Sequence, residues 1–176
     1  MAELLIGAGA NRAKKMFMPE RKEWTGLVTL DFNADHKPDV VHDLSVMPYP
    51  FVDNAFDEVH AYEVMEHLGK QGDWQFFFAQ WSELWRILKP GGIFFGTSPH
   101  WSSPWCWMDP GHTRAMGPEM LGFLNQPQYV QQVGITPMTD YRFCYKADFD
   151  IVHNVLTEER QFQYAVMAAK PSRIIT

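Results

Sequence analysis

The chain has 176 residues, of which 46% are hydrophobic, 20% are charged and 15% are aromatic, and its net charge is −6. This length fits one domain, residues 1–176, with a full hydrophobic core, and the composition excludes a disordered or collagen-like chain. The acidic balance argues against a protein that binds by neutralising nucleic-acid phosphates, although a nucleic-acid substrate held by a local basic patch stays open.

The length of the apolar runs, the N-terminal segment and the number of cysteines predict the cellular compartment. No apolar run approaches the ~20 residues that a membrane-spanning helix needs, so we expect no membrane span. The first strand-like run begins at Glu3, which leaves no room for a secretory signal. Two cysteines, Cys106 and Cys144, are too few for a disulfide framework. We therefore expect a cytoplasmic protein.

Short apolar runs bounded by Gly, Pro or Asp predict buried strands. They comprise residues 3–6, 27–30, 39–42, 57–62 and 92–96. Between the last two runs, apolar residues recur every three or four positions from Trp74 to Leu88, which predicts an amphipathic helix. Asp73 is the expected N-cap, and the Lys-Pro-Gly-Gly segment 89–92 ends the helix. A strand, a helix and a further strand form a parallel crossover.

The C-terminal third predicts two helices and a hairpin. The helices are expected at 118–125 and 128–133, separated at Pro127, and the hairpin strands at 149–156 and 161–168. Together the runs predict an α/β fold: a doubly wound, Rossmann-like, mostly parallel seven-stranded sheet with a C-terminal antiparallel hairpin. Segment 32–38 is too short for a helical crossover. One face of the sheet should therefore be thinly covered, which makes a homodimer possible.

A glycine turn and two aspartates stand where consecutive predicted strands end. Gly7-Ala8-Gly9 follows the first strand, Asp31 closes the second and Asp43 the third. The carboxyl ends of neighbouring strands meet at the crevice where such sheets bind ligands, although a tight turn and loop-capping aspartates would give the same residues. The dinucleotide fingerprint requires a third glycine where this chain has Arg12, which disfavours a nicotinamide-dependent oxidoreductase without removing it.

The string of motifs resembles the class I S-adenosylmethionine-dependent methyltransferases. The resemblance runs through about residues 4–96 and is carried by the segments 4–12, 30–31, 38–44, 53–59, 63–68 and 83–92. It implies that Gly7, Ala8 and Gly9 line the methionine part of the cofactor and that Asp31 holds the ribose hydroxyls. It also implies that Asp43 and the Leu44 N–H hold the adenine, with Tyr62 and Glu63 beside the transferable methyl group.

The resemblance implies methyl transfer by in-line displacement to an acceptor that we expect to be a small molecule or a sugar. The aromatic-rich segment 98–114 is the expected cover of the substrate. His100 and then His112 are the candidate general bases, although either also fits a hydrogen-bonded loop residue. No zinc-type spacing is present, so we predict no metal site. The alternative function is a cofactor-binding but inactive partner or sensor domain.

Overall fold

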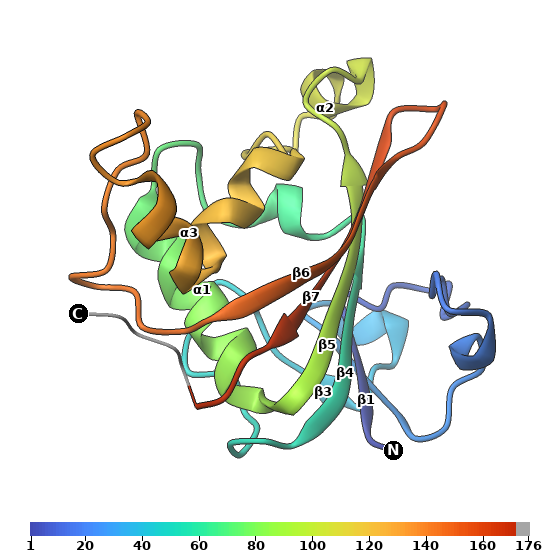
Figure 1. Cartoon of the computed structure of the whole chain (residues 1–176). Coiled ribbons are helices and arrows are strands. Elements are labelled where there is room, and N and C mark those ends of the chain that lie inside the picture. Colours follow the sequence, from blue (N-terminus) through green and yellow to red (C-terminus); the bar gives the residue numbers. More distant parts are fainter. Residues whose placement is uncertain (172–176) are drawn as a thin grey trace.

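The computed structural model describes residues 1–171 and is built around one seven-stranded sheet. The strands are β1 (Glu3–Ile6), β2 (Leu27–Asp31), β3 (Val40–Val41), β4 (Phe56–Tyr62), β5 (Leu88–Pro99), β6 (Phe149–Leu156) and β7 (Gln161–Ala168). Their order is β3-β2-β1-β4-β5-β7-β6 (Figure 1). Strands β1 to β5 run parallel, and β7 pairs antiparallel with both β5 and β6. The predicted fold class is confirmed.

The long predicted helix is present as α1 (Trp74–Ile87). The Asp73 carboxylate accepts a hydrogen bond from the Phe76 N–H at 3.0 Å, which is the expected N-cap. The inward stripe of the helix, which includes Trp81, Leu84 and Ile87, is fully buried. Trp81 packs edge-on against Phe94 of β5 and Phe149 of β6, so the helix covers the centre of one sheet face.

The remaining helices are short. They are α2 (Pro104–Met108), α3 (Gln126–Gln132) and the 3-10 helices η1 (Pro19–Arg21), η2 (Ala34–His36), η3 (Met65–His67) and η4 (Pro118–Leu124). Two predictions need correction here. The 118–125 segment is a 3-10 helix, and Pro127 lies in the first turn of α3 instead of separating two helices. A proline is tolerated in a first turn because its missing N–H has no partner there.

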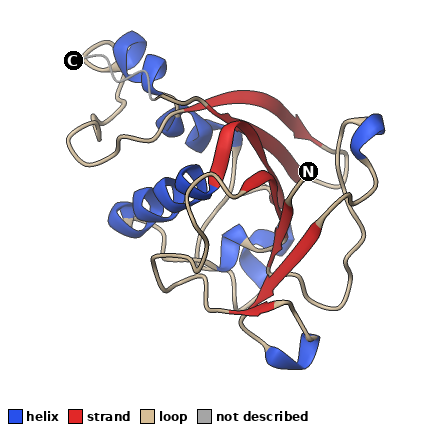
Figure 2. Cartoon of the chain, turned by 90° about the horizontal axis from the view of Figure 1, so that it is seen from below, coloured by secondary structure: helices blue, strands red, loops and turns tan. Residues whose placement is uncertain are grey.

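The two faces of the sheet are covered differently. Helix α1 lies on one face with α3 and η4, whereas an irregular segment, residues 10–26, covers the other (Figures 1 and 2). Within residues 1–171 neither β1 and β2 nor β2 and β3 are joined by an α-helix. The predicted bare connection at 32–38 is a loop that contains only the short helix η2. No described helix is long and apolar enough to cross a membrane.

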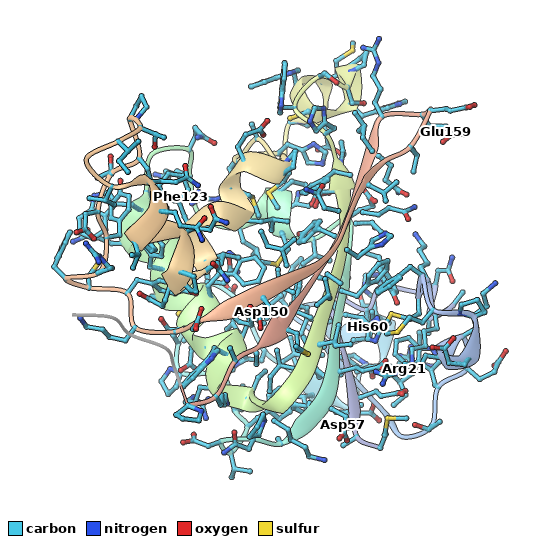
Figure 3. The ribbon with its side chains drawn as sticks, viewed as in Figure 1. Arg21, Asp57, His60, Phe123, Asp150 and Glu159 are labelled. Carbon is cyan, nitrogen blue, oxygen red and sulfur yellow. The ribbon has the colours of Figure 1, made fainter. Side chains whose placement is uncertain are left out.

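A buried ionic cluster fixes segment 10–26 to the sheet. The Lys14 ammonium lies 3.0 Å from Glu3 Oε1 and 2.7 Å from Glu58 Oε2, and all three side chains are almost fully buried. Arg21 and His60 also contact the Glu58 carboxylate, at 3.1 and 2.9 Å (Figure 3). The segment is therefore held by buried charge and also by apolar packing, since its Met16 clusters with Phe95 of β5 and Ala165 of β7.

Candidate functional site

The glycine turn after β1 has backbone angles that residues with a side chain rarely adopt. Gly7 has φ +58°, and a Cβ on this residue would lie 2.5 Å from Val64 Cγ2. Gly9 has φ +53°, but a Cβ there would meet no atom within 4 Å. Glycine at position 7 is thus required by both conformation and space, whereas at position 9 it leaves the main chain open to a ligand.

Asp31 joins this turn to the end of β2. Its Oδ2 accepts a hydrogen bond from the Gly9 N–H at 2.8 Å, and its Oδ1 accepts one from the Asn33 N–H at 2.8 Å. His36 Nδ1 lies 3.3 Å from Oδ2. Burial opposes ionisation of this carboxyl group, but the N–H donors of Asn33 and Gly9 outweigh it and keep the pKa of Asp31 below its usual value. A buried carboxylate therefore stands ionised beside the glycine turn.

A cavity of about 530 Å³ lies at the carboxyl ends of β1, β2 and β4, and we call it the strand-end cavity. Six residues predicted from the sequence line it: Gly7, Gly9, Asp31, Asp43, Leu44 and Glu63. The prediction did not include the other lining residues, which are Phe32, His36, His42, Val64, His67, Leu68 and Gly111. The structure thus brings most of the predicted cofactor residues around one space.

Asp43, which follows β3 in the chain, supplies a second carboxylate to the strand-end cavity. Its Oδ1 accepts hydrogen bonds from the Ser45 N–H at 2.8 Å and from the Ser45 hydroxyl at 2.7 Å. These two donors lower the pKa of Asp43, so this carboxylate is also ionised. The cavity therefore offers two fixed acceptors, one at the end of β2 and one after β3.

Ala8 and Tyr62 line a second cavity, of about 230 Å³, at the glycine turn, together with Lys15. Gly7 and Gly9 line this cavity as well as the strand-end cavity. The Tyr62 hydroxyl accepts from the Lys15 N–H at 3.0 Å and lies 2.8 Å from His60 Nδ1. Tyr62 is the last residue of β4, whereas Glu63 follows the strand with φ +57° and lines the strand-end cavity.

Glu63 stands between two cavities. Its Oε1 accepts hydrogen bonds from the Thr97 hydroxyl and from the Gln161 amide, each at 2.8 Å. Besides the strand-end cavity it lines a space of about 400 Å³ next to α2, which we call the α2 cavity. The α2 cavity is lined by Glu63, His67, Pro99, Ser103, Trp105, Asp109, His112, Glu159, Arg160 and Gln161. Glu63 and His67 are common to both cavities, so these two side chains lie at the boundary between them.

The α2 cavity is built from three parts of the chain. Segment 98–114, the predicted substrate cover, supplies Trp105 from α2 and the loop that follows it. The tip of the β6–β7 hairpin supplies Glu159, which Figure 3 shows at the end of that hairpin, and its neighbour Arg160. Trp105 is 71% exposed, so this tryptophan faces outward beside the cavity instead of packing into the core.

The two predicted bases have different surroundings. His112 lines the α2 cavity, where its Nε2 lies 4.0 Å from Glu66 Oε1 and 3.9 Å from Asp109 Oδ2. His100 is buried and lines neither cavity, and its Nδ1 is 2.8 Å from the Ser102 hydroxyl. Only His112 is placed to act on a molecule in the α2 cavity.

Glu66 is a buried carboxyl group that the sequence prediction did not select. It is 1% exposed, and its Oε2 accepts a hydrogen bond from the Ser98 hydroxyl at 2.8 Å. Burial is the main reason that the pKa of Glu66 is raised to about 8, and the nearby Glu63 carboxylate adds to the shift. Glu66 is adjacent to His67 in the chain and close to Glu63, but its proximity to His112 depends on the fold.

Comparison with known proteins identifies a family. The family model described as "Methyltransferase domain" matches residues 7–96, whereas no curated protein matches the chain. An S-adenosylmethionine-dependent methyltransferase from Archaeoglobus fulgidus is 19% identical, with a TM-score of 0.57 over 94% of this chain and 86% of that one. A second such enzyme, from Aquifex aeolicus, is 13% identical, with a TM-score of 0.54 over 95% and 81%.

A further structural relative is the N-methyltransferase NodS from Bradyrhizobium japonicum WM9, solved in complex with S-adenosyl-L-homocysteine. It is 15% identical, with a TM-score of 0.54 over 95% of this chain and 77% of that one. The family match extends from the glycine turn to the middle of β5, the part of the chain that carries the strand-end cavity. This chain therefore belongs to the methyltransferase-domain family, and its sheet is that of a class I S-adenosylmethionine-dependent methyltransferase.

Proposed function

We propose that the chain binds S-adenosylmethionine in the strand-end cavity and transfers its methyl group to an acceptor in the α2 cavity. The observation that carries this proposal is the sharing of Glu63 and His67 by the two cavities, which makes the cavities neighbours. The family match covers every residue that lines the first of these cavities except Gly111.

The residues of the strand-end cavity fit this cofactor chemically. The open main chain at Gly9 accommodates the methionine part, and the ionised Asp31 carboxylate accepts hydrogen bonds from the ribose hydroxyls. Asp43 accepts from the adenine amino group, with the Leu44 N–H against the ring. We assign Ala8 and Tyr62 to the support of the turn, since they line the second cavity there, which Gly7 and Gly9 share with the strand-end cavity.

The transfer itself needs positioning more than acid–base power. The bound cofactor supplies a methyl group on a positively charged sulfur. The protein holds the acceptor in line with that methyl group and keeps water out. A bond forms from the acceptor to the methyl carbon while the carbon–sulfur bond breaks, and the acceptor loses a proton. His112 is the predicted base that borders the acceptor, whereas His100 has no contact with the α2 cavity.

The α2 cavity favours a polar acceptor of small size. Its volume of about 400 Å³ fits one small molecule or sugar unit. Carboxylates and amides at Glu63, Asp109 and Gln161 offer hydrogen-bond acceptors and donors to hydroxyl or amino groups, and Trp105 offers an aromatic face.

Calorimetry tests the cofactor part of the proposal. We expect wild-type protein to bind S-adenosylmethionine and S-adenosylhomocysteine, and we expect Asp31→Ala to weaken both at least tenfold, because the buried acceptor is lost. Asp35→Ala is the matched control, since Asp35 is exposed and lines no part of the cavity, and its affinity should equal that of wild type. Absence of binding by wild type at near-millimolar cofactor would refute the proposal.

Turnover tests the transfer step. With a panel of hydroxylated and amino-bearing small molecules and sugars, release of S-adenosylhomocysteine should exceed the level measured without acceptor. Cofactor binding without any turnover would instead support the inactive partner or sensor domain.

A further inference from the structure

One cluster of side chains in the α2 cavity has the composition of a metal site. A carboxylate oxygen of Glu66 and ring nitrogens of His67 and His112 all lie within 4.8 Å of one another. In residues 1–171 this is the one group of three such side chains close enough to share an ion. Glu66 and His67 come from η3, and His112 comes from the loop after α2, so the fold brings them together.

Two buried atoms of the cluster have no hydrogen-bond partner among the described residues. They are Glu66 Oε1 and His112 Nδ1, and the Glu66 side chain is 1% exposed. The 4.0 Å between Glu66 Oε1 and His112 Nε2 is too long for a hydrogen bond. An unpartnered buried carboxyl oxygen is costly, and a cation held between these groups would take the place of the carboxyl proton and satisfy that oxygen.

The surrounding contacts prepare the side chains as ligands. His67 Nδ1 lies 3.1 Å from the Gly111 carbonyl oxygen, to which it donates its proton, and this leaves the lone pair on Nε2. The Ser98 hydroxyl holds the other Glu66 oxygen at 2.8 Å. A backbone carbonyl behind a histidine and a donor behind a carboxylate are the outer contacts that orient metal ligands.

We infer that Glu66, His67 and His112 bind a divalent first-row transition-metal cation such as Zn²⁺ or Mn²⁺, which holds a hydroxyl oxygen of the acceptor in the α2 cavity. Two imidazoles and one carboxylate suit these ions better than Mg²⁺, which prefers oxygen ligands. Three protein ligands leave positions open toward the cavity. Asp109, whose Oδ2 is 3.9 Å from His112 Nε2, stands at the rim with a further negative charge, while Arg160 contributes a positive one.

This inference rests on the proposed function and gives it an acceptor class. A metal-bound hydroxyl loses its proton near neutral pH as metal-bound water does, because the ion stabilises the oxyanion. The proton leaves to solvent, the oxygen–carbon bond forms, and the carbon–sulfur bond of the donor breaks. On this account His112 acts through the ion and does not itself take the proton, and the product is a methyl ether.

Titration of the metal alone tests the site. We expect chelator-treated full-length protein to bind one Mn²⁺ or Zn²⁺ by calorimetry and one Mn²⁺ by electron paramagnetic resonance. Glu66→Gln and His112→Ala should each weaken binding at least tenfold. Glu66→Gln keeps an acceptor for the Ser98 hydroxyl and should retain the fold, which circular dichroism and thermal unfolding check. His153→Gln, on β6 outside the cluster, should bind as wild type does.

The outcomes separate this inference from the proposed function. No binding of either ion to wild type at millimolar concentration, or equal affinity in wild type and Glu66→Gln, would overturn the metal site. Water-proton relaxation of the Mn²⁺ complex should show exchangeable coordinated water, and its absence would overturn the role in holding a hydroxyl. Calorimetry with the cofactor in chelator tests the strand-end cavity alone, so either site can fail without the other.

Discussion

At the scale of single residues, Gly7 carries the sharpest structural requirement. Its φ is +58°, and an added Cβ would lie 2.5 Å from Val64 Cγ2. Gly7→Ala should therefore lower the free energy of unfolding by about 2–4 kcal/mol, since a left-handed alanine costs about 1–2 kcal/mol and the clash adds to it. Urea denaturation measures the change.

Gly9 is the matched control for this substitution. Its φ is also positive, at +53°, but its Cβ would meet no atom, so Gly9→Ala should cost only the conformational part. The double variant Gly7→Ala with Val64→Ala should recover part of the loss by making room. Equal losses at positions 7 and 9 would show that the contact with Val64 does not constrain the turn.

At the scale of elements, segment 10–26 replaces a covering helix and depends on buried charge. Lys14→Met removes the ammonium between Glu3 and Glu58, which leaves two buried carboxylates without their shared cation. Removing one partner of a buried ion pair typically costs about 3–5 kcal/mol, and we expect a loss of that size. Limited proteolysis within the segment should also become faster than in wild type.

Two variants show whether the loss comes from the unpaired charge. Adding Glu58→Gln to Lys14→Met should restore part of the stability, because one uncompensated carboxylate is removed. Lys15→Met changes an exposed neighbour and should alter the free energy of unfolding by no more than about 0.5 kcal/mol. A Lys14→Met protein as stable as wild type would mean that apolar packing alone holds the segment.

At the scale of the whole molecule, the same cluster predicts how stability depends on pH. Burial opposes ionisation of Glu58, but hydrogen bonds from His60 and Lys14 outweigh it and lower its pKa to about 2. In the unfolded chain this pKa is about 4.3, so the stability that Glu58 contributes is lost as pH falls from there toward 2. Burial lowers the pKa of His60, which therefore resists a proton that the unfolded chain accepts below about pH 6.5.

Both shifts have the same sign, so the free energy of unfolding should decrease as pH falls from about 6.5 to 2. Urea denaturation at a series of pH values measures it. Glu58→Gln should lose the part of this dependence that lies between about pH 4.3 and 2. A wild-type stability that is flat from pH 6.5 to 3 would contradict the prediction.

Much of this architecture follows from local sequence signals. Periodicity and the Asp73 cap predict α1, and four polar residues between two β-rich runs predict the β6–β7 hairpin with the observed bounds. Strand β5 extends to Pro99, beyond the predicted end at 96, because its last residues pair with β7, as Pro99 does with Gln161. That pairing is long-range, and the residues at the strand end alone do not reveal it.

The candidate site, too, follows in part from local sequence signals and in part from long-range contacts. Strand order brings Gly7, Asp31 and Asp43 to one cavity, as the motif string implies. The approach of His112 to Glu66 depends on the path of the loop after α2, which no periodicity encodes. Tyr62 and Glu63 line different cavities, because the chain leaves β4 after Tyr62 and Glu63 has a left-handed backbone with φ +57°, which no local pattern in the sequence predicts.

The irregular path of residues 10–26 also sets the electrostatics behind the glycine turn. An α-helix beginning there would direct the partial positive charge of its N-terminus at the strand-end cavity. Residues 10–26 contain no such helix, and Lys15 lines the 230 Å³ cavity at the turn, with its ammonium 5.3 Å from the centre of the Tyr62 ring. A helix dipole is fixed, whereas the charge of an exposed lysine is screened by salt within about 8 Å at physiological ionic strength. Attraction of an anionic group to the Lys15 side of the turn should therefore weaken as salt is added.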